Sequence, residues 1–217
     1  MKIYFLLIPI IIGIMFGVIF TSNFEETSYD SSILNKNNLL HGSTILGNPD
    51  AKITIVEFGD YQCTFCYKFH NDVMKKIYDE YIKSGDVNFI YKDFPLNGQS
   101  SIMASEASYC AQKQNHYWQY HDKLYDNWGG ENTGWITQDA LIGFAMESGL
   151  NLDEFNSCMK NSEFQQKVLD NEQFAREINI SATPSFLIFS DNEVYRIIGA
   201  QPFEKFEQIF EELGTFG

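Results

Sequence analysis

The sequence predicts an α/β fold in which a group of helices interrupts one sheet. Residues 53–58 form an apolar run typical of a strand, a helical pattern follows, and a second strand pattern covers residues 87–91. From residue 100 to about residue 170 the pattern is helical throughout, and a strand hairpin and a final helix end the chain. A β-α-β unit implies parallel strands joined by a right-handed crossover. The helical stretch is therefore predicted to be an insertion between strands of the same sheet.

The composition is that of a globular protein with a substantial core. The 217 residues are 44% hydrophobic and 16% aromatic, which suits one elaborated domain or two small ones. The formal net charge of −14 argues against a nucleic-acid partner, which would need a basic surface. The four cysteines are an even number, as expected in an oxidising compartment.

The N-terminus predicts a membrane segment. Residues 3–20 carry no charge, and this run is longer than the apolar region of about 7–15 residues in a signal peptide. No A-x-A-like cleavage site follows, so we expect residues 1–20 to form an uncleaved anchor, with a cleaved signal as the alternative. Lys2 precedes the run and acidic residues follow it, which places the body of the protein outside the cytoplasm.

The first part of the domain is predicted over residues 41–99, after a polar linker over residues 21–40. A short strand at residues 41–47 ends in a Gly-Asn-Pro-Asp turn. The strand at residues 53–58 is apolar enough to be buried on both faces. Glu57 is the exception within it, because a buried carboxylate is costly.

A helix is predicted over residues 64–83. Apolar side chains recur at every fourth position and define one face, made of Phe65, Phe69, Val73, Ile77 and Tyr81. The Ser-Gly-Asp sequence at residues 84–86 ends this helix before the strand at residues 87–91.

The helical insertion is predicted over residues 100–170, with breaks at residues 128–134 and 148–150. The second part of the domain covers residues 171–217. A helix over residues 163–180 leads back to the sheet, and a hairpin of strands and a last helix follow, at residues 186–189, 194–198 and 203–213. Pro184 stands at the start of a strand, and the Thr183–Pro184 bond is a candidate cis peptide.

Cys63 and Cys66 form a Cys-x-x-Cys pair at the start of the helix that follows the first long strand, the arrangement of a thioredoxin-type redox site. Free backbone N–H groups at a helix N-terminus stabilise a thiolate, which is the attacking species. The same pair could be half of a zinc site, but that needs two further ligands. Cys110 and Cys158 are isolated and His70 is the only nearby imidazole, so we expect no metal.

The other candidate groups have simpler interpretations. Cys110, on a helix predicted over residues 102–125, and Cys158 most simply form a structural disulfide. Two free buried thiols and a second electron-relay pair are the alternatives. His70 is predicted to be a histidine on the helix surface, although it could tune Cys66. His116 and His121 are predicted to pack between helices rather than to form a ligand pair.

Several motifs occur in a fixed order along residues 41–213. They are Gly47-x-Pro49-x-Ala51, Glu57-Phe58-x-Asp60-Tyr61-x-Cys63-x-x-Cys66, Tyr91-Lys92-Asp93-Phe94-Pro95-Leu96, Tyr117-Trp118-x-Tyr120-His121-Asp122-x-Leu124, Thr183-Pro184-Ser185-Phe186 and Gly199-Ala200-Gln201. Together they resemble the DsbA-like thiol–disulfide oxidoreductases of the thioredoxin superfamily. The resemblance implies a thioredoxin fold with an inserted α-helical subdomain, and the uncharged N-terminal run predicts one transmembrane or signal segment before it.

The resemblance implies a role for each site residue. Cys63 would be the nucleophile and Cys66 the buried resolving thiol. Pro184 would be the cis-proline opposite the disulfide, and Thr183 would offer its backbone to the substrate. Glu57 matches the buried acid of the family, which takes up or relays the proton of Cys66.

The dipeptide between the cysteines departs from the family pattern. Most relatives have proline there, often with histidine or an aromatic residue, whereas this chain has Thr64 and Phe65, which we assign to substrate binding. No imidazolium stabilises the Cys63 thiolate and no proline rigidifies the turn. We therefore expect an intermediate reduction potential.

The predicted function is that of a thiol–disulfide oxidoreductase acting through Cys63 and Cys66 on extracytoplasmic protein thiols and donating disulfides to folding proteins. A disulfide isomerase or reductase, and a non-catalytic chaperone or binding module, are the alternatives. We expect a monomer without a cofactor, with protein thiols as substrates and a membrane redox partner that reoxidises the pair. It would be a single-pass protein of the cell membrane with its catalytic domain outside, or secreted if the N-terminal segment is cleaved.

Overall fold

The computed structural model describes residue 39 and residues 44–190 and 193–213, and within them one mixed sheet has the strand order β1-β3-β2-β4-β5. The central strand β2 is parallel to β3 and antiparallel to β4, while β1 and β5 pair antiparallel at the two edges. The parallel pair and the terminal hairpin are those predicted from the sequence. The strands are β1 (Ile45–Leu46), β2 (Ile53–Gly59), β3 (Val87–Asp93), β4 (Ser185–Phe189) and β5 (Val194–Ile198).

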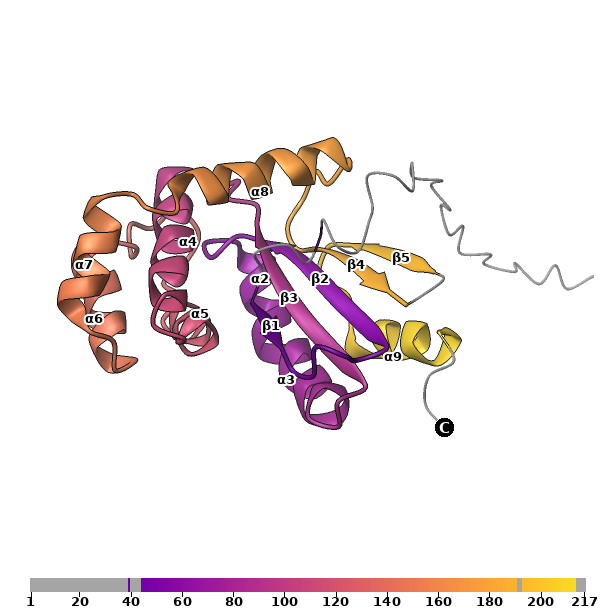
Figure 1. The fold of residues 1–217 in the computed structure, drawn as a ribbon. Helices are drawn as coiled ribbons and strands as arrows, with labels where there is room; N and C mark the ends of the chain where they lie inside the picture. Colours follow the sequence, from indigo (N-terminus) through magenta and orange to yellow (C-terminus); the bar gives the residue numbers. More distant parts are fainter. Residues whose placement is uncertain (1–38, 40–43, 191–192, 214–217) are drawn as a thin grey trace, which may run out of the picture.

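Helices cover both faces of the sheet and stand beside it (Figure 1). One continuous helix connects β2 to β3. It consists of α2 (Thr64–Phe69), the π-helical turn η1 (His70–Met74), α3 (Lys75–Ile77) and the π-helical turn η2 (Tyr78–Ile82). The other helices are α4 (Gln99–Gln112), α5 (Tyr117–Asp126), α6 (Gln138–Glu147), α7 (Leu152–Lys160), α8 (Gln165–Glu177) and α9 (Phe203–Glu212).

The side chains of the central strands alternate between two cores. Ile55 and Phe186 face α2 and α9, where Phe69 and Phe206 complete the larger core. The next residues along the same strands, such as Val56 and Leu187, face the opposite core under α8. Successive strand residues point to opposite faces, so a run that is apolar at nearly every position needs helices on both sides.

The inserted helices α4 to α7 gather at one side of the sheet, and α8 runs from them back across it (Figure 1). The prediction of one helix over residues 102–125 is wrong in one respect, because the chain forms two helices there, α4 and α5, with a break between them. Asn115 at this break has a φ of 62°, a left-handed conformation that a continuous helix cannot contain and that asparagine tolerates.

The predicted anchor over residues 1–20 and the linker over residues 21–40 fall outside the described residues, except for the buried Leu39. Within the described part of the chain, no helix has the length and apolar character needed to span a membrane.

Candidate active site

The two cysteines lie where β2 ends and α2 begins. Cys63 occupies the N-cap position of α2 in an extended conformation, and its carbonyl accepts the first helical hydrogen bond, from Tyr67 N, at 3.0 Å. The sulfur of Cys63 therefore faces the unpaired N–H groups of the first helical turn. Both cysteines are free thiols; Cys63 is 5% exposed and Cys66 is fully buried.

The turn before Cys63 is tied to the inserted helices by the buried carboxylate of Asp60. This carboxylate accepts hydrogen bonds from the backbone N–H of Gln62 at 2.8 Å, from the backbone N–H of Asn97 at 2.7 Å and from the hydroxyl of Ser101 at 2.6 Å. Burial raises the pKa of Asp60, and these hydrogen bonds oppose that rise. Asp60 thus connects the turn before Cys63 to the start of α4.

The two thiols have pKa values shifted in opposite directions. The hydrogen bond from Cys66 is the largest of the influences that lower the pKa of Cys63 to about 6, with further help from Thr183 and from backbone N–H groups at the helix start. Burial raises the pKa of Cys66 well above its usual value, and the Cys63 thiolate adds to this. At neutral pH the reduced pair is a Cys63 thiolate beside a Cys66 thiol.

Glu57 lies beneath the pair on β2, in register with Tyr91 on β3 and Phe186 on β4. Its side chain is buried, and its Oε1 atom has no hydrogen-bond partner in the described part of the chain. Burial first, and the Cys63 thiolate second, raise the pKa of Glu57 well above its usual value, while a hydrogen bond with Cys66 partly offsets the rise. Glu57 is therefore a buried carboxyl group, with a raised pKa, that is hydrogen-bonded to Cys66.

Thr183 and Pro184 complete the site from the start of β4. The peptide bond between them is cis, and the Sγ atom of Cys63 lies 3.4 Å from the carbonyl oxygen of Thr183, to which it donates a hydrogen bond when the thiol is protonated. Residues 120 positions apart in the chain thus meet at the Cys63 sulfur.

A loop between α5 and α6 supplies contacts that sequence reasoning missed. The Glu131 carboxylate accepts hydrogen bonds from the backbone N–H and the hydroxyl of Thr64. Trp128 stacks on Tyr67 with ring centroids 4.4 Å apart and donates a hydrogen bond to the Gln62 carbonyl at 3.1 Å. The Trp-Gly-Gly sequence marked this loop as a break between helices, but nothing in the sequence pointed it at the cysteines.

Phe65, which was placed on the apolar face of this helix and also assigned to substrate binding, is exposed. Its side chain is 55% exposed, whereas Phe69 and Ile77 are buried in the core. Phe65 lies in the first turn, beside the cysteines, and the ammonium of Lys68 lies 5.4 Å from its ring centroid. The four-residue spacing predicts which residues share a face of the helix. It does not predict how much of that face other parts of the protein cover.

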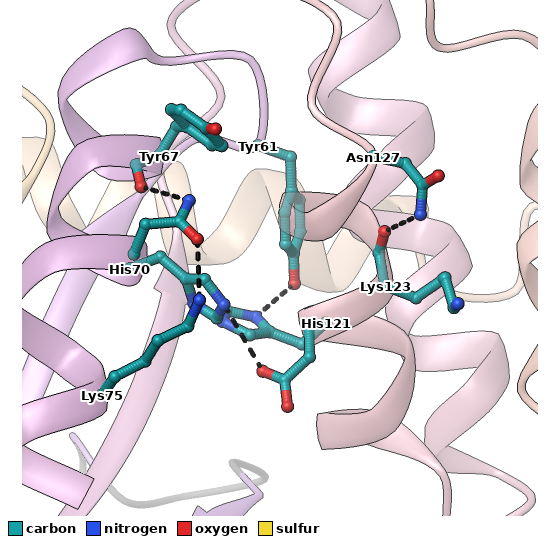
Figure 2. Close-up of polar contacts among 9 residues, drawn as sticks. Tyr61, Tyr67, His70, Lys75, His121, Lys123 and Asn127 are labelled. Atoms are coloured by element: carbon teal, nitrogen blue, oxygen red, sulfur yellow. Dashed lines mark hydrogen bonds and ion pairs between the residues drawn. The ribbon is translucent and has the colours of Figure 1, made fainter.

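His70 is not the surface histidine that the sequence predicted. It is 8% exposed, and its ring stacks on Tyr125 of α5 at a centroid distance of 4.7 Å. Burial lowers the pKa of His70 to about 4, and it lowers that of His121 well below its usual value. His121 packs in the core as predicted; Tyr61 Oη lies 2.9 Å from its Nδ1 atom (Figure 2).

Cys110 and Cys158 are joined in a disulfide between α4 and α7, with 5.8 Å between their Cα atoms. Both are buried. Of the alternatives left open by the sequence, the structure has the structural disulfide. It crosslinks the inserted helices to one another and leaves Cys63 and Cys66 as the free thiols of the described residues.

Comparisons with known proteins agree with this site. The thioredoxin family model matches residues 40–212. Disulfide bond formation protein D of Bacillus subtilis (strain 168) is 29% identical over 153 residues, which cover 69% of this chain and 68% of that protein. A probable disulfide bond formation protein D of Bacillus anthracis is 28% identical over 148 residues, covering 66% and 68% of the two chains.

Solved structures show the same architecture. Oxidised BdbD from Bacillus subtilis aligns with a TM-score of 0.71 at 27% identity, over 79% of this chain and 92% of that one. Wolbachia pipientis α-DsbA1 aligns with a TM-score of 0.72 at 26% identity, over 82% of this chain and 96% of that one. The chain therefore belongs to the thioredoxin family, as a DsbA-like thiol–disulfide oxidoreductase.

Proposed function

We propose that this oxidoreductase works in the oxidising direction and donates the Cys63–Cys66 disulfide to protein thiols. The observation that carries the proposal is the lowered pKa of Cys63, about 6. A stabilised thiolate favours the reduced form of the pair and so makes its disulfide a better oxidant. Cys63 occupies the N-cap of α2, where the helix stabilises a thiolate, and we retain the intermediate potential expected from Thr64 and Phe65.

The proposed reaction has two exchange steps. A substrate thiolate attacks the sulfur of Cys63, which breaks the Cys63–Cys66 bond and releases Cys66 as a thiolate. A second substrate thiolate then attacks the substrate sulfur of the mixed disulfide and displaces Cys63. The substrate loses two electrons to the enzyme and leaves with a new disulfide, while the cysteine pair is left reduced.

Glu57 and the segment at Thr183–Pro184 support these steps in our proposal. Glu57 touches Cys66 and has a raised pKa, so it can hold the proton that the departing Cys66 thiolate needs. The backbone of Thr183 already faces Cys63, and an extended substrate would pair with it as an added strand. Thr64 and the exposed Phe65 border the same surface and would contact the substrate beside its reacting thiol.

We propose that catalysis takes place outside the cytoplasm, with residues 1–20 as the anchor. The Cys110–Cys158 disulfide supports this, because structural disulfides persist in oxidising compartments. Turnover requires an oxidant for the reduced pair, and a membrane redox protein is the class of partner proposed. Modification of Cys63 in intact cells by a membrane-impermeant maleimide, after mild reduction, tests this placement; labelling that requires lysed cells would overturn it.

Two assays run side by side test the direction. We expect the oxidised protein to introduce disulfides into reduced ribonuclease, and to be a weaker catalyst of insulin reduction by dithiothreitol. Cys63→Ser should abolish both activities, and Glu204→Gln on α9 serves as a control remote from the cysteines. The reverse ranking, together with a thioredoxin-like potential in a glutathione redox equilibrium, would establish the reductase or isomerase. Activity in neither assay would leave only a binding module.

A further inference from the structure

Three side chains that can bind a metal meet between the inserted helices and the helix that starts at Cys63, which we call the redox helix. His70 begins η1 directly after α2, while His121 and Asp122 are neighbours on α5. Each offers one ligand atom, and the three atoms lie within 4.8 Å of one another. The Nε2 atom of His70 is 3.9 Å from the Oδ1 atom of Asp122. None of these residues takes part in the exchange steps proposed above.

The two imidazoles are held in place by packing. The His70 and His121 ring centroids are 5.6 Å apart, and the ring of Tyr125 contacts both. His121 also meets Tyr91 and Trp118 edge to face, at 4.8 and 5.0 Å. The rings therefore cannot rotate freely, so most of the ordering cost of binding a ligand has been met by folding.

The cluster opens on a surface pocket of about 500 Å³ whose lining includes His70 and Asp122. Besides His70, four charged side chains line it: Asp79, Asp122, Asp126 and Lys75. Asp79 is paired with Lys83 outside the pocket, and the Lys75 amine donates a hydrogen bond to Asn71 at 2.9 Å. Asp122 and Asp126 thus outweigh the single charge of Lys75, and the pocket attracts cations.

We propose that His70, His121 and Asp122 form a binding site for a divalent transition-metal ion of the zinc class. Two imidazoles and one carboxylate form a ligand set that suits zinc, with a fourth position open to the pocket for water. In this site Nε2 of His121 binds the ion while Nδ1 keeps its contact with the Tyr61 hydroxyl. Such a second contact commonly fixes the orientation of metal-bound histidines.

The ligand atoms must move closer together to hold an ion. Bonds of about 2.0–2.2 Å from zinc to nitrogen and oxygen place tetrahedral ligand atoms roughly 3.3–3.5 Å apart, whereas the three atoms here lie within 4.8 Å of one another. Rotation of the Asp122 side chain, which is 58% exposed, can shorten its 3.9 Å separation from His70, and a shift of η1 toward α5 would bring the two imidazoles into range. The π-helical turn that begins at His70 gives further support, because π-helical turns are frequent at functional sites. An ion bound here would link the redox helix to α5, two elements far apart in the chain.

Zinc binding to the oxidised, untagged full chain in mild detergent tests the proposal. Oxidation removes the Cys63 and Cys66 thiols, which would otherwise compete for the ion. Displacement of zinc by a chromophoric chelator should report one ion per chain, and Co²⁺ in its place should give the visible absorption of a tetrahedral site. Calcium, which prefers oxygen ligands, should not compete.

Matched variants separate coordination of the ion from its electrostatic attraction to the pocket. Bound zinc should raise the Tm of the protein. Asp122→Asn should raise the dissociation constant for zinc about tenfold or more and abolish this rise in Tm. Asp79→Asn removes the same charge from the same pocket and should change neither. His70→Gln should alter the Co²⁺ absorption if the protein folds, and Asp122→Asn keeps the test decisive if it does not. Equal weakening by the two aspartate variants, or no binding of zinc at micromolar concentrations, would overturn the proposal.

Discussion

Glu131 accepts hydrogen bonds from both the backbone N–H and the hydroxyl of Thr64, at 3.4 and 3.2 Å. Thr64 directly follows Cys63, the nucleophile in the proposed reaction, and lies in the first turn of α2. The N-terminal end of a helix stabilises negative charge, and at this helix a carboxylate shares that position with the Cys63 thiolate. The site therefore contains a group that counteracts its own thiolate stabilisation.

Removing this charge should strengthen the oxidant. Glu131→Gln keeps a hydrogen-bond acceptor but loses the charge, and with it the repulsion between the carboxylate and the Cys63 thiolate. The coupling of two charges at a protein surface is worth about 0.2–1 kcal/mol. We therefore expect the pKa of Cys63 to fall by a few tenths of a unit and the reduction potential to rise by roughly 4–20 mV, since 30 mV corresponds to about 1.4 kcal/mol. Glutathione equilibration measures the potential, and Glu204→Gln is the control. An unchanged or lower potential would show that Glu131 acts only as a helix cap.

The thiolate of Cys63 should depend on Cys66. In the reduced protein, absorbance of the thiolate should titrate with a midpoint near pH 6. Cys66→Ala removes the largest stabilising hydrogen bond and should shift this midpoint upward, toward the usual value of 9.0. Cys66→Ser retains a donor and should shift it less. Identical midpoints in the two variants would contradict the assignment of Cys66 as the donor.

Glu57 should make the reduced protein less stable as pH rises. Below about pH 4.5, its usual value, the carboxyl is protonated in both the folded and the unfolded chain. Above that pH the unfolded chain loses this proton while the folded chain keeps it, until the raised folded pKa is reached, so the free energy of unfolding falls over this window. Glu57→Gln should remove the dependence.

Urea unfolding of the glutathione-reduced protein at several pH values measures this. The stability gained by Glu57→Gln should grow as pH rises from about 4.5. Glu204→Gln, which removes a carboxylate from the exposed surface of α9, should leave the pH dependence as it is. A gain that is constant with pH would show that Glu57 ionises normally in the folded protein.

The Cys110–Cys158 disulfide should stabilise the inserted helices without taking part in exchange. The paired substitutions Cys110→Ala and Cys158→Ala should lower the free energy of unfolding by roughly 2–4 kcal/mol. The glutathione equilibrium of Cys63 and Cys66 should not change, because the disulfide lies between α4 and α7.

The intact mass of a Cys63→Ser/Cys66→Ser variant checks the bond directly. Without reductant it should be lower than the fully reduced mass by two hydrogens. A mass equal to the reduced one would show that these two cysteines are free thiols. A changed active-site equilibrium in the alanine pair would instead point to electron relay between the two cysteine pairs.

Local patterns determined the order of elements and the reactive pair. The apolar run of β2 predicted a strand buried on both faces, and β2 is covered by α2 and α9 on one side and by α8 on the other. Cys63 and Cys66 could be placed at the start of a helix because the strand, the turn and the helical spacing adjoin in the chain. Thr183 and Pro184 were recognised from their motif, and the structure sets Thr183 against Cys63.

The tertiary structure alone decided what covers each helix. His70 was predicted on the surface because the helical pattern of residues 64–83 contains no information about α5, which packs over it. Phe65 was placed on the same apolar face as Phe69, yet it is exposed, because the spacing does not show where the residues that cover that face end. Glu131 and Asp122 reach Thr64 and His70 only through the packing of the insertion against α2. A sequence period records which residues share a face, whereas the partner of that face is set by contacts between distant segments, and these contacts tune the site that the sequence located.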